Sequence, residues 1–262
     1  MITFSRYKLS DFLACQRRFQ LRYIQNLPWP TPPQPSDQAE ALTHGEQFHR
    51  LLERHFLGLS VDAAALPNPL RSWWHTWQTD PPAIPPGHTL PEFRLTVPIS
   101  QHLLLGRFDL LILGDHSAHI YDWKTERRPR TASALRADLQ SRLYLALVAE
   151  GIRAIHPQKT PIPPEQVQLT YWFVEAPAAT VTLTYSTAEH AQNWSDLSQI
   201  VGQIEAQMTT TTPWPLTTDL QECGRCVYQL FCTRPRPTLQ LDEHWYQETP
   251  EHPETNLEPA LP

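Results

Sequence analysis

The sequence lacks a hydrophobic run long enough to cross a membrane. Its longest apolar stretches are interrupted by Arg107, Asp109 or Glu150, well short of the about 20 residues that a membrane-spanning helix needs. The first residues, Met-Ile-Thr-Phe-Ser-Arg-Tyr-Lys, do not include the apolar segment of a secretory signal. We therefore expect a soluble, cytoplasmic protein without a membrane partner.

An excess of positive charge is also lacking, since the formal net charge is −6. The acidic residues gather near the C-terminus, where residues 236–262 carry −5 and the other 235 residues only −1. Six cations nevertheless fall within 19 residues: Lys124, Arg127, Arg128, Arg130, Arg136 and Arg142. Such a run is most often a solvated surface, so it indicates nucleic-acid binding only together with other signals.

Internal repeats are absent, and proline divides the chain into segments. The 27 prolines gather near residues 28–35, 81–86, 157–164 and 213–215. Residues 236–262 combine Pro, Glu and Thr with little apolar content, which predicts a disordered tail after a domain of residues 1–235.

The hydrophobic pattern between the prolines predicts a mixed α/β fold, with a sheet covered by helices. Helices are predicted near 10–24 and 38–56, around Trp73 to Trp77, from 131 or 133 through Leu147, and over 187–208. Strands are predicted at 103–113, 118–125, 167–175 and 180–185. The tryptophan cluster is expected to pack in the core in preference to stacking on bases.

Two of these strands form a hairpin that places carboxylates face to face. With Gly114 to Ser117 as the loop, each cross-strand pair sums to 231, so Asp109 lies opposite Asp122. Directly opposite Cβ atoms are about 4.5–5.5 Å apart. Lys124 lies on the same face as Asp122, two residues further along.

Two facing carboxylates repel each other, and a hard divalent cation such as Mg²⁺ offsets that cost directly. A lysine beside such an ion can stabilise the negative charge that develops on a phosphate. The structural alternative is a polar patch in which Lys124 and Arg107 form salt bridges with the two acids.

Spaced motifs around this hairpin resemble the PD-(D/E)XK nuclease superfamily in its RecB-like branch. They are Gly45-Glu-Gln-Phe-His49, Gly106-Arg-Phe-Asp109, Asp122-Trp-Lys124-Thr125 and Gln140-x-x-x-Tyr144, within about residues 5–235. The resemblance implies a restriction-endonuclease-like fold, a central mixed sheet flanked by helices. Glu92 matches an acidic position often found ahead of the Gly-x-x-Asp strand.

The same resemblance implies roles for individual residues. His49, Asp109 and Asp122, with the backbone carbonyl of Trp123, would be ligands of Mg²⁺ or Mn²⁺. Lys124 would be the catalytic lysine. Gln140 and Tyr144, one helical turn apart, would lie at the rim of the active site near the scissile DNA.

One of the four cysteines lies near the N-terminus, and the other three lie close together near residue 230. Cys223, Cys226 and Cys232 form a C-x₂-C-x₅-C cluster, and Cys15 lies 208 residues before it. By count alone, four thiolates suit a structural zinc or a [4Fe–4S] cluster equally well. The resemblance favours iron and sulfur, because related CRISPR-associated and AddB-type nucleases have this division. Many of those relatives have proline directly after the first cysteine, where this chain has Gln16. Such a cluster would join the N- and C-terminal segments.

Together these patterns predict a metal-dependent deoxyribonuclease, expected to act as an exonuclease in DNA repair, recombination or CRISPR adaptation. Seven arginines would contact the backbone of single-stranded DNA or duplex ends: Arg17, Arg18, Arg127, Arg128, Arg130, Arg136 and Arg142. No helicase motif is present, so a helicase or another repair or CRISPR protein would be a separate partner. The alternative is a module that keeps the fold and binds DNA or assembles a complex without cleavage.

Overall fold

The computed structural model describes residues 1–28, 36–156, 161–224 and 226–232. The predicted disordered tail, residues 236–262, lies outside the described residues. The chain divides into two compact units, one of Met1–Ser10 with Thr43–Thr212 and one of Asp11–Leu42 with Pro213–Pro262. The first unit contains the sheet, and the second contains all four cysteines.

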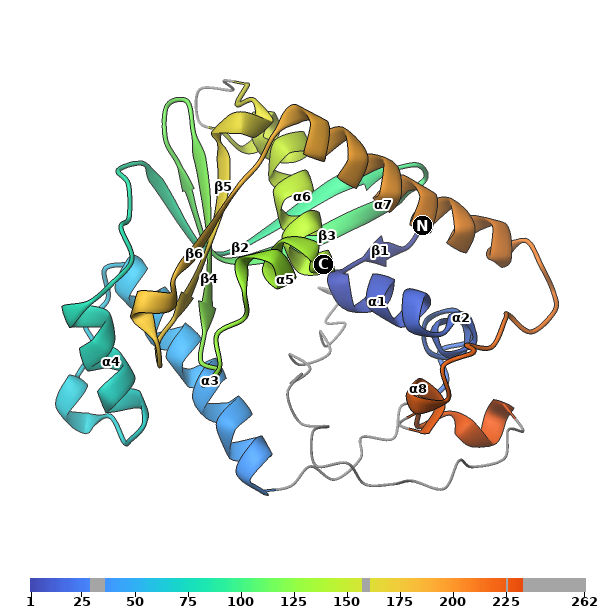
Figure 1. The fold of residues 1–262 in the computed structure, drawn as a ribbon, viewed down its shortest axis with the longest axis horizontal. Coiled ribbons are helices and arrows are strands. Elements are labelled where there is room, and N and C mark those ends of the chain that lie inside the picture. Colours follow the sequence, from blue (N-terminus) through green and yellow to red (C-terminus); the bar gives the residue numbers. More distant parts are fainter. Residues whose placement is uncertain (29–35, 157–160, 225, 233–262) are drawn as a thin grey trace, which may run out of the picture. The chain divides into compact units, whose positions relative to one another are not determined.

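A six-stranded mixed sheet is the centre of the first unit (Figure 1). Its strands are β1 Thr3–Phe4, β2 His88–Ile99, β3 His102–Leu113, β4 Ala118–Lys124, β5 Val167–Phe173 and β6 Val181–Thr184. Hydrogen-bonded strands follow the order β1-β3-β4-β5-β6, and β2 pairs with the edge of β3 that β1 and β4 leave open. The β1–β3 and β4–β5 pairs are parallel, and the other three pairs are antiparallel. The predicted mixed α/β class is confirmed.

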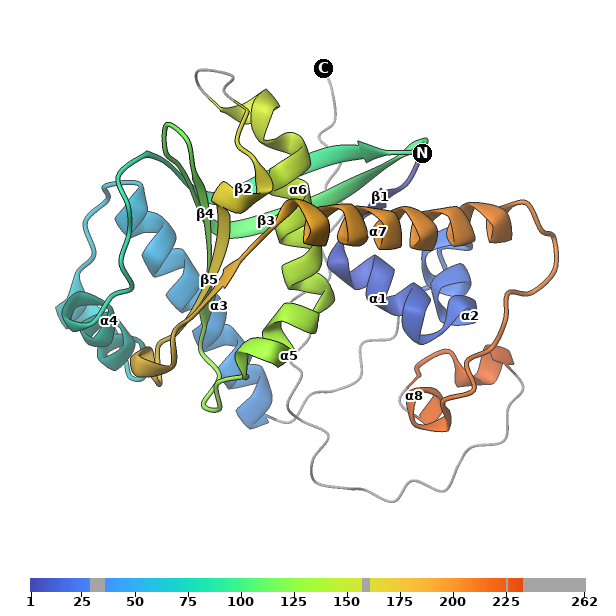
Figure 2. The same cartoon turned by 45° about the horizontal axis from the view of Figure 1, so that its top comes forward.

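Helices cover both faces of this sheet. The longer ones are α3 Ser36–Phe56, α4 Leu70–Thr79, α6 Leu139–Ile155 and α7 Thr187–Met208. A shorter helix of the same unit is α5 Ala132–Ala137. The second unit contains the short helices α2 Gln16–Phe19 and α8 Leu220–Gly224 and a π-helical turn at Gln20–Ile24, and α1 Arg6–Ala14 begins in the first unit and ends in the second. Figure 2 shows α3 and α6 on opposite sides of the central strands. No helix among the described residues is long and apolar enough to span a membrane.

An aromatic cluster joins α3 and α4 to one face of the sheet. Trp73, Trp74 and Trp77 of α4 are each no more than 8% exposed and pack with Phe48 of α3 and Trp123 of β4. Trp77 meets Trp123 edge-on, with ring centroids 5.3 Å apart. The tryptophans therefore belong to the core, as predicted. Edge-on contacts between such rings add to the stabilisation that comes from burial.

The sequence patterns identified most elements, with several corrections. Strands β1 and β2 were not predicted, and the first helix begins at Arg6, ahead of the predicted start near residue 10. The helix predicted near 10–24 is interrupted at Cys15, whose backbone is extended. The helix predicted from residue 131 is two helices, because Thr131 caps α5 and Asp138 caps α6 by accepting a hydrogen bond from the Gln140 amide. The final long helix, 187–208, has the predicted bounds.

Two glycines test the tightness of this fold. A Cβ added at Gly87, just before β2, would lie 2.6 Å from the Leu113 carbonyl oxygen, whereas a Cβ at Gly202 in α7 meets nothing within 4 Å. We expect Gly87→Ala to lower the free energy of unfolding by about 1–3 kcal/mol. Gly202→Ala should raise it by about 0.5–1 kcal/mol, because alanine favours the helix. Urea unfolding of both variants measures the difference, and equal effects would contradict the packing around Gly87.

Candidate active site

Three acidic residues occupy one row across neighbouring strands. The β3–β4 hairpin has the predicted register, with Leu110 opposite Tyr121 and Leu113 opposite Ala118. Continued by one position, this register aligns Asp109 with Asp122. On the other side of β3, Pro91 pairs with Leu110 and Phe93 with Phe108, so Glu92 aligns with Asp109. The row therefore runs Glu92–Asp109–Asp122 across β2, β3 and β4.

The regular ladder is interrupted at this row. The β3–β4 pairing ends at Leu110, and the Asp109 carboxylate accepts a hydrogen bond of 2.7 Å from the Trp123 amide. The observed register, if continued, places Asp109 level with Asp122, but the two residues are not a backbone pair of the ladder. Glu92 has a φ of 49°, a left-handed conformation that is costly for a residue with a side chain.

The residues of β3 on either side of Asp109 pack against opposite faces of the sheet. Phe108 packs against Tyr144 of α6, with ring centroids 4.9 Å apart, whereas Leu110 belongs to the cluster under α3 and α4. Residues two apart in a regular strand share a face. The alternation therefore breaks at Asp109, at the position aligned with the left-handed Glu92.

His49 approaches the row from α3. A Cβ at Gly45 would lie 3.2 Å from Thr125 Oγ1, so the glycine lets this helix pass close to the end of β4. One turn later, His49 Nδ1 lies 3.2 Å from Asp109 Oδ1. Burial opposes protonation of His49, but the charge and hydrogen bond of Asp109 outweigh it and raise the pKa of His49 to about 9. Burial by itself would raise the pKa of Asp109, but His49 lowers it.

Potential metal ligands meet at this point. One ligand atom from each of His49, Glu92 and Asp109 lies within 4.8 Å of the other two. Burial and the charge of Asp109 raise the pKa of Glu92, although Arg107 Nε donates a hydrogen bond of 2.6 Å to it. One imidazole and closely spaced carboxylates are a donor set that fits a divalent cation, which would relieve the repulsion between the acids.

Asp122 has different neighbours from those of the other two acids. It is 3% exposed, and its Oδ1 lies 2.7 Å from Lys124 Nζ. Its Oδ2 accepts a hydrogen bond of 2.9 Å from Gln140 Nε2. Asp122 is not in the group formed by His49, Glu92 and Asp109 among the described residues, although its charge contributes to the raised pKa of His49. The ligand roles of Asp122 and the Trp123 carbonyl stay predictions.

The helix α6 brings Gln140 and Tyr144 to the row. A Cβ at Gly106 would lie 2.7 Å from Leu147 Cδ1, so the glycine permits the close approach of α6 to β3. Gln140 Nε2 donates to the Tyr144 hydroxyl at 3.2 Å, and that hydroxyl donates to the Arg107 carbonyl at 2.5 Å. The predicted shared helix face is confirmed. Tyr171, which the sequence patterns did not single out, is the β5 residue paired with Asp122.

The candidate DNA-contacting arginines lie in different environments. Ion pairs hold Arg130 to Asp138, Arg136 to Glu189 and Arg142 to Asp196. In the second unit, Arg18 lies 3.2 Å from Asp11 and 2.9 Å from Glu222, and Arg17 donates to Gln20. Arg127 and Arg128 are exposed and make no hydrogen bond or ion pair with another described residue.

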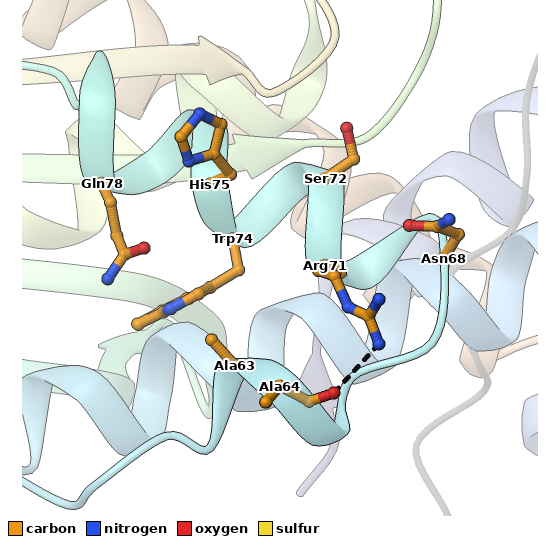
Figure 3. A pocket seen from close by; sticks show the side chains of 8 residues that line it. All are labelled: Ala63, Ala64, Asn68, Arg71, Ser72, Trp74, His75 and Gln78. Carbon is orange, nitrogen blue, oxygen red and sulfur yellow. Dashed lines mark hydrogen bonds between the residues drawn. The ribbon is translucent and has the colours of Figure 1, made fainter.

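A separate pocket of about 480 Å³ lies beside α4 (Figure 3). Its lining includes Trp74, His75 and Gln78, and Arg71 donates a hydrogen bond to the Ala64 carbonyl across it. None of the residues of the acidic row, nor His49 or Lys124, lines this pocket. The pocket is therefore separate from the acidic row.

The second unit brings its two chain segments together around the cysteines. Phe19 stacks on Trp214 at 5.8 Å, and the Trp214 amide donates to Gln20 Oε1. None of the four cysteines forms a disulfide in the described chain. Burial raises the pKa of Cys226, and the charges of Cys15 and Cys232 raise it further. The cysteines as placed do not form a group of ligand atoms within 4.8 Å in the described chain.

Comparison with known proteins gives solved structures and a family profile that are similar to this chain. Among the solved structures that align with the chain is SSO0001, at 14% identity and a TM-score of 0.41, over 88% of this chain and 85% of that one. Another is a provisionally assigned exonuclease from Eubacterium rectale, at 8% identity and a TM-score of 0.44, over 81% of this chain and 90% of that one. No curated protein was found to match the sequence. Neither structural similarity is close enough to support a function.

A family profile gives the decisive match. The profile of the PD-(D/E)XK nuclease superfamily matches residues 3–83 and 59–233, which together contain the acidic row, His49, Lys124, Gln140 and all four cysteines. The central mixed sheet with helices on both faces is consistent with the restriction-endonuclease-like fold predicted from the motifs. The chain belongs to the PD-(D/E)XK nuclease superfamily.

Proposed function

We propose that this nuclease is a metal-dependent deoxyribonuclease of the RecB-like branch that acts as an exonuclease. The observation that carries the proposal is the buried Asp122 carboxylate, aligned with Asp109 and Glu92 and held 2.7 Å from Lys124. Burying a charged group costs free energy unless the group is paired with an opposite charge or binds a metal ion. DNA repair, recombination or CRISPR adaptation would be its setting, with any helicase as a separate partner.

The donor atoms at the row would hold Mg²⁺ or Mn²⁺. His49, Glu92 and Asp109 are the group that the structure brings together, with Asp122 and the Trp123 carbonyl as further ligands. A bound divalent ion would polarise the scissile phosphate and lower the pKa of the attacking water. His49 must lose its proton to become a ligand, so protons and metal compete for its Nδ1.

The remaining residues supply charge and orientation. Lys124 holds a positive charge next to the row, where negative charge develops on the phosphate during hydrolysis. Gln140 fixes the second oxygen of Asp122 from the first turn of α6. Tyr144 is fixed in turn by the Arg107 carbonyl, so both side chains are oriented before substrate arrives.

The test of this function separates the ligand from the lysine. Asp122→Asn and Lys124→Met should both abolish cleavage of end-labelled DNA with Mn²⁺. A preorganised charge of this kind supplies about 10²–10³-fold in rate. Calorimetry should show weaker Mn²⁺ binding in Asp122→Asn, because a ligand is lost. Binding should be retained in Lys124→Met.

Glu189→Gln is the matched control, because Glu189 is an exposed acid paired with Arg136 and distant in sequence from the row. It should cleave DNA as fast as the wild-type protein. DNA binding without metal-dependent cleavage by the wild-type protein would instead support a scaffolding module that has kept the nuclease fold.

Contacts to the DNA backbone are proposed for the arginines after β4. Arg127 and Arg128 fit this role best, because the other three arginines of the run already have carboxylate partners. Both follow Lys124 within four residues, so they lie near the catalytic lysine along the chain. Backbone contacts of this kind are independent of sequence and weaken with salt.

Binding measured in an Asp122→Asn background tests the arginines without cleavage. Replacing Arg127 and Arg128 with Glu should weaken binding to all DNA sequences alike. The salt dependence should flatten by about one unit for each lost phosphate contact. Arg136→Gln is the control and should leave both quantities unchanged, because Glu189 already holds that side chain. An unchanged affinity in the double variant would indicate that Arg127 and Arg128 are only a solvated surface.

A [4Fe–4S] cluster held by Cys15, Cys223, Cys226 and Cys232 is proposed for the second unit. Its support is the presence of all four cysteines in this unit and the electrostatic influence of Cys15 and Cys232 on Cys226. Burial raises the pKa of Cys226, and the positive charge of Arg18 offsets part of that rise. A cation next to the thiols favours the thiolate form that ligates iron or zinc. The cluster would join the two segments of this unit and support folding.

Anaerobically purified protein should therefore be brown, absorb near ~400 nm and contain iron. Cys226→Ser should remove the colour, and Leu230→Ser, at an exposed neighbouring position, should keep it. Stoichiometric zinc without iron in the anaerobic preparation would show that the four thiolates form a zinc site.

A further inference from the structure

Tyr171 lies directly beside the lysine and acid of the proposed active site. On the parallel β4–β5 pair, Tyr171 is the register partner of Asp122. Lys124 Nζ lies 5.5 Å from the centroid of the Tyr171 ring, within the about 6 Å at which a cation is attracted to an aromatic face. The same nitrogen lies 2.7 Å from Asp122 Oδ1. Lys124 is therefore attracted to two groups on adjacent strands.

The Tyr171 ring is itself held in place. Its hydroxyl lies 2.8 Å from Ser141 Oγ, and Ser141 Oγ donates to the Leu135 carbonyl at the end of α5. The hydrogen bond from Ser141 to a carbonyl leaves the Tyr171 hydroxyl as the donor to Ser141 Oγ. Ser141 directly follows Gln140, the residue that contacts the other oxygen of Asp122. One turn of α6 thus fixes both Asp122 and the ring of Tyr171.

From this geometry we propose that Tyr171 is a positioning residue that holds the Lys124 ammonium group over the acidic row through the face of its ring. The proposal rests on the proposed function, in which Lys124 stabilises charge on the phosphate. Tyr171 is 1% exposed, so it acts through Lys124 and does not touch substrate.

A lysine needs such a support because its side chain is flexible. The four methylene groups of a lysine allow many rotamers. A single ion pair restrains the distance from the ammonium group to its partner but leaves the direction of approach free. The ring of Tyr171 adds a second attraction from the neighbouring strand. A charge that is already in place when the reaction occurs lowers the barrier more than one that must first reorient.

The first experiment compares two substitutions at Tyr171 in the full-length protein. Tyr171→Leu removes the ring, and single-turnover cleavage with Mn²⁺ should slow about tenfold, the size expected from losing a partly desolvated cation–π contact. The KM for DNA and the affinity for Mn²⁺ should not change, because Asp122 is retained. Tyr171→Phe keeps the ring and loses only the contact with Ser141, so its kcat should stay close to that of the wild-type protein.

Leu169→Ala is the control for a general packing defect. Leu169 lies two residues earlier on the same face of β5 and is fully buried. This variant should lose stability but keep its kcat below its unfolding temperature. If Leu169→Ala slows cleavage as much as Tyr171→Leu, or if Tyr171→Leu cleaves as fast as wild type, Tyr171 is only a core residue. Should Tyr171→Leu not fold, Tyr171→Met removes the same ring with a longer side chain.

A second measurement does not depend on cleavage. The sequence contains three lysines, Lys8, Lys124 and Lys159, so a lysine-labelled protein gives a simple NMR spectrum that Lys124→Met assigns. The ε-methylene protons of Lys124 should show a ring-current shift in wild type and Tyr171→Phe that disappears in the Leu or Met variant. If wild type does not cleave DNA, the proposed function fails, while this shift still reports the contact. Absence of the shift in wild type would overturn the proposal.

Discussion

The repulsion among three carboxylates in one row of the sheet is the constraint on which the rest of the site depends. Glu92, Asp109 and Asp122 lie on neighbouring strands, where like charges destabilise the sheet. Each acid has its own compensation. Arg107 contacts Glu92, His49 and the Trp123 amide contact Asp109, and Lys124 with Gln140 contacts Asp122. The surrounding helices and strands are placed so that these compensating groups reach the row.

Close packing of helices on the sheet is what makes that reach possible. Gly45 and Gly106 remove the side chains that would keep α3 and α6 further from β4 and β3. Behind the row, the aromatic cluster of α3, α4 and the central strands forms a tightly packed support. Interiors of this density resist displacement, so the positions of His49 and Lys124, which directly follow Phe48 and Trp123 of that cluster, are set by the core. The Gly-x-x-x-His and Gly-x-x-Asp motifs thus combine a reactive side chain with the glycine that lets its helix or strand approach.

The parts of the site that depend on local pattern were predictable from the sequence. The four-residue loop after Leu113 and the alternation of the strands determine the hairpin register, and helical spacing puts Gln140 and Tyr144 on one face. The place of Glu92 was not predictable in this way, because Pro91 and Pro98 argue against a strand and the alternation of apolar residues in β2 begins only after Glu92, at Phe93. The acids that pair with Arg136 and Arg142 lie about fifty residues further along, on α7, so only the tertiary fold brings them together. The number of arginines in the run is therefore larger than the number whose positive charge has no carboxylate partner in the fold.

The two oxygens of Asp122 show how the fold prepares a charged group for use. Lys124 contacts Oδ1 from the same strand, and Gln140 contacts Oδ2 from the first turn of α6. Asp138, the residue directly before α6, caps that helix. Because the two contacts come from independently fixed elements, rotating the carboxylate would break at least one of them. Each oxygen still has more than one lone-pair direction, so a cation can bind without displacing either partner. Asp122 thus combines a fixed orientation with remaining capacity to bind a metal ion. The proposed metal-dependent chemistry requires both properties, whereas an acid that only forms a salt bridge would need neither.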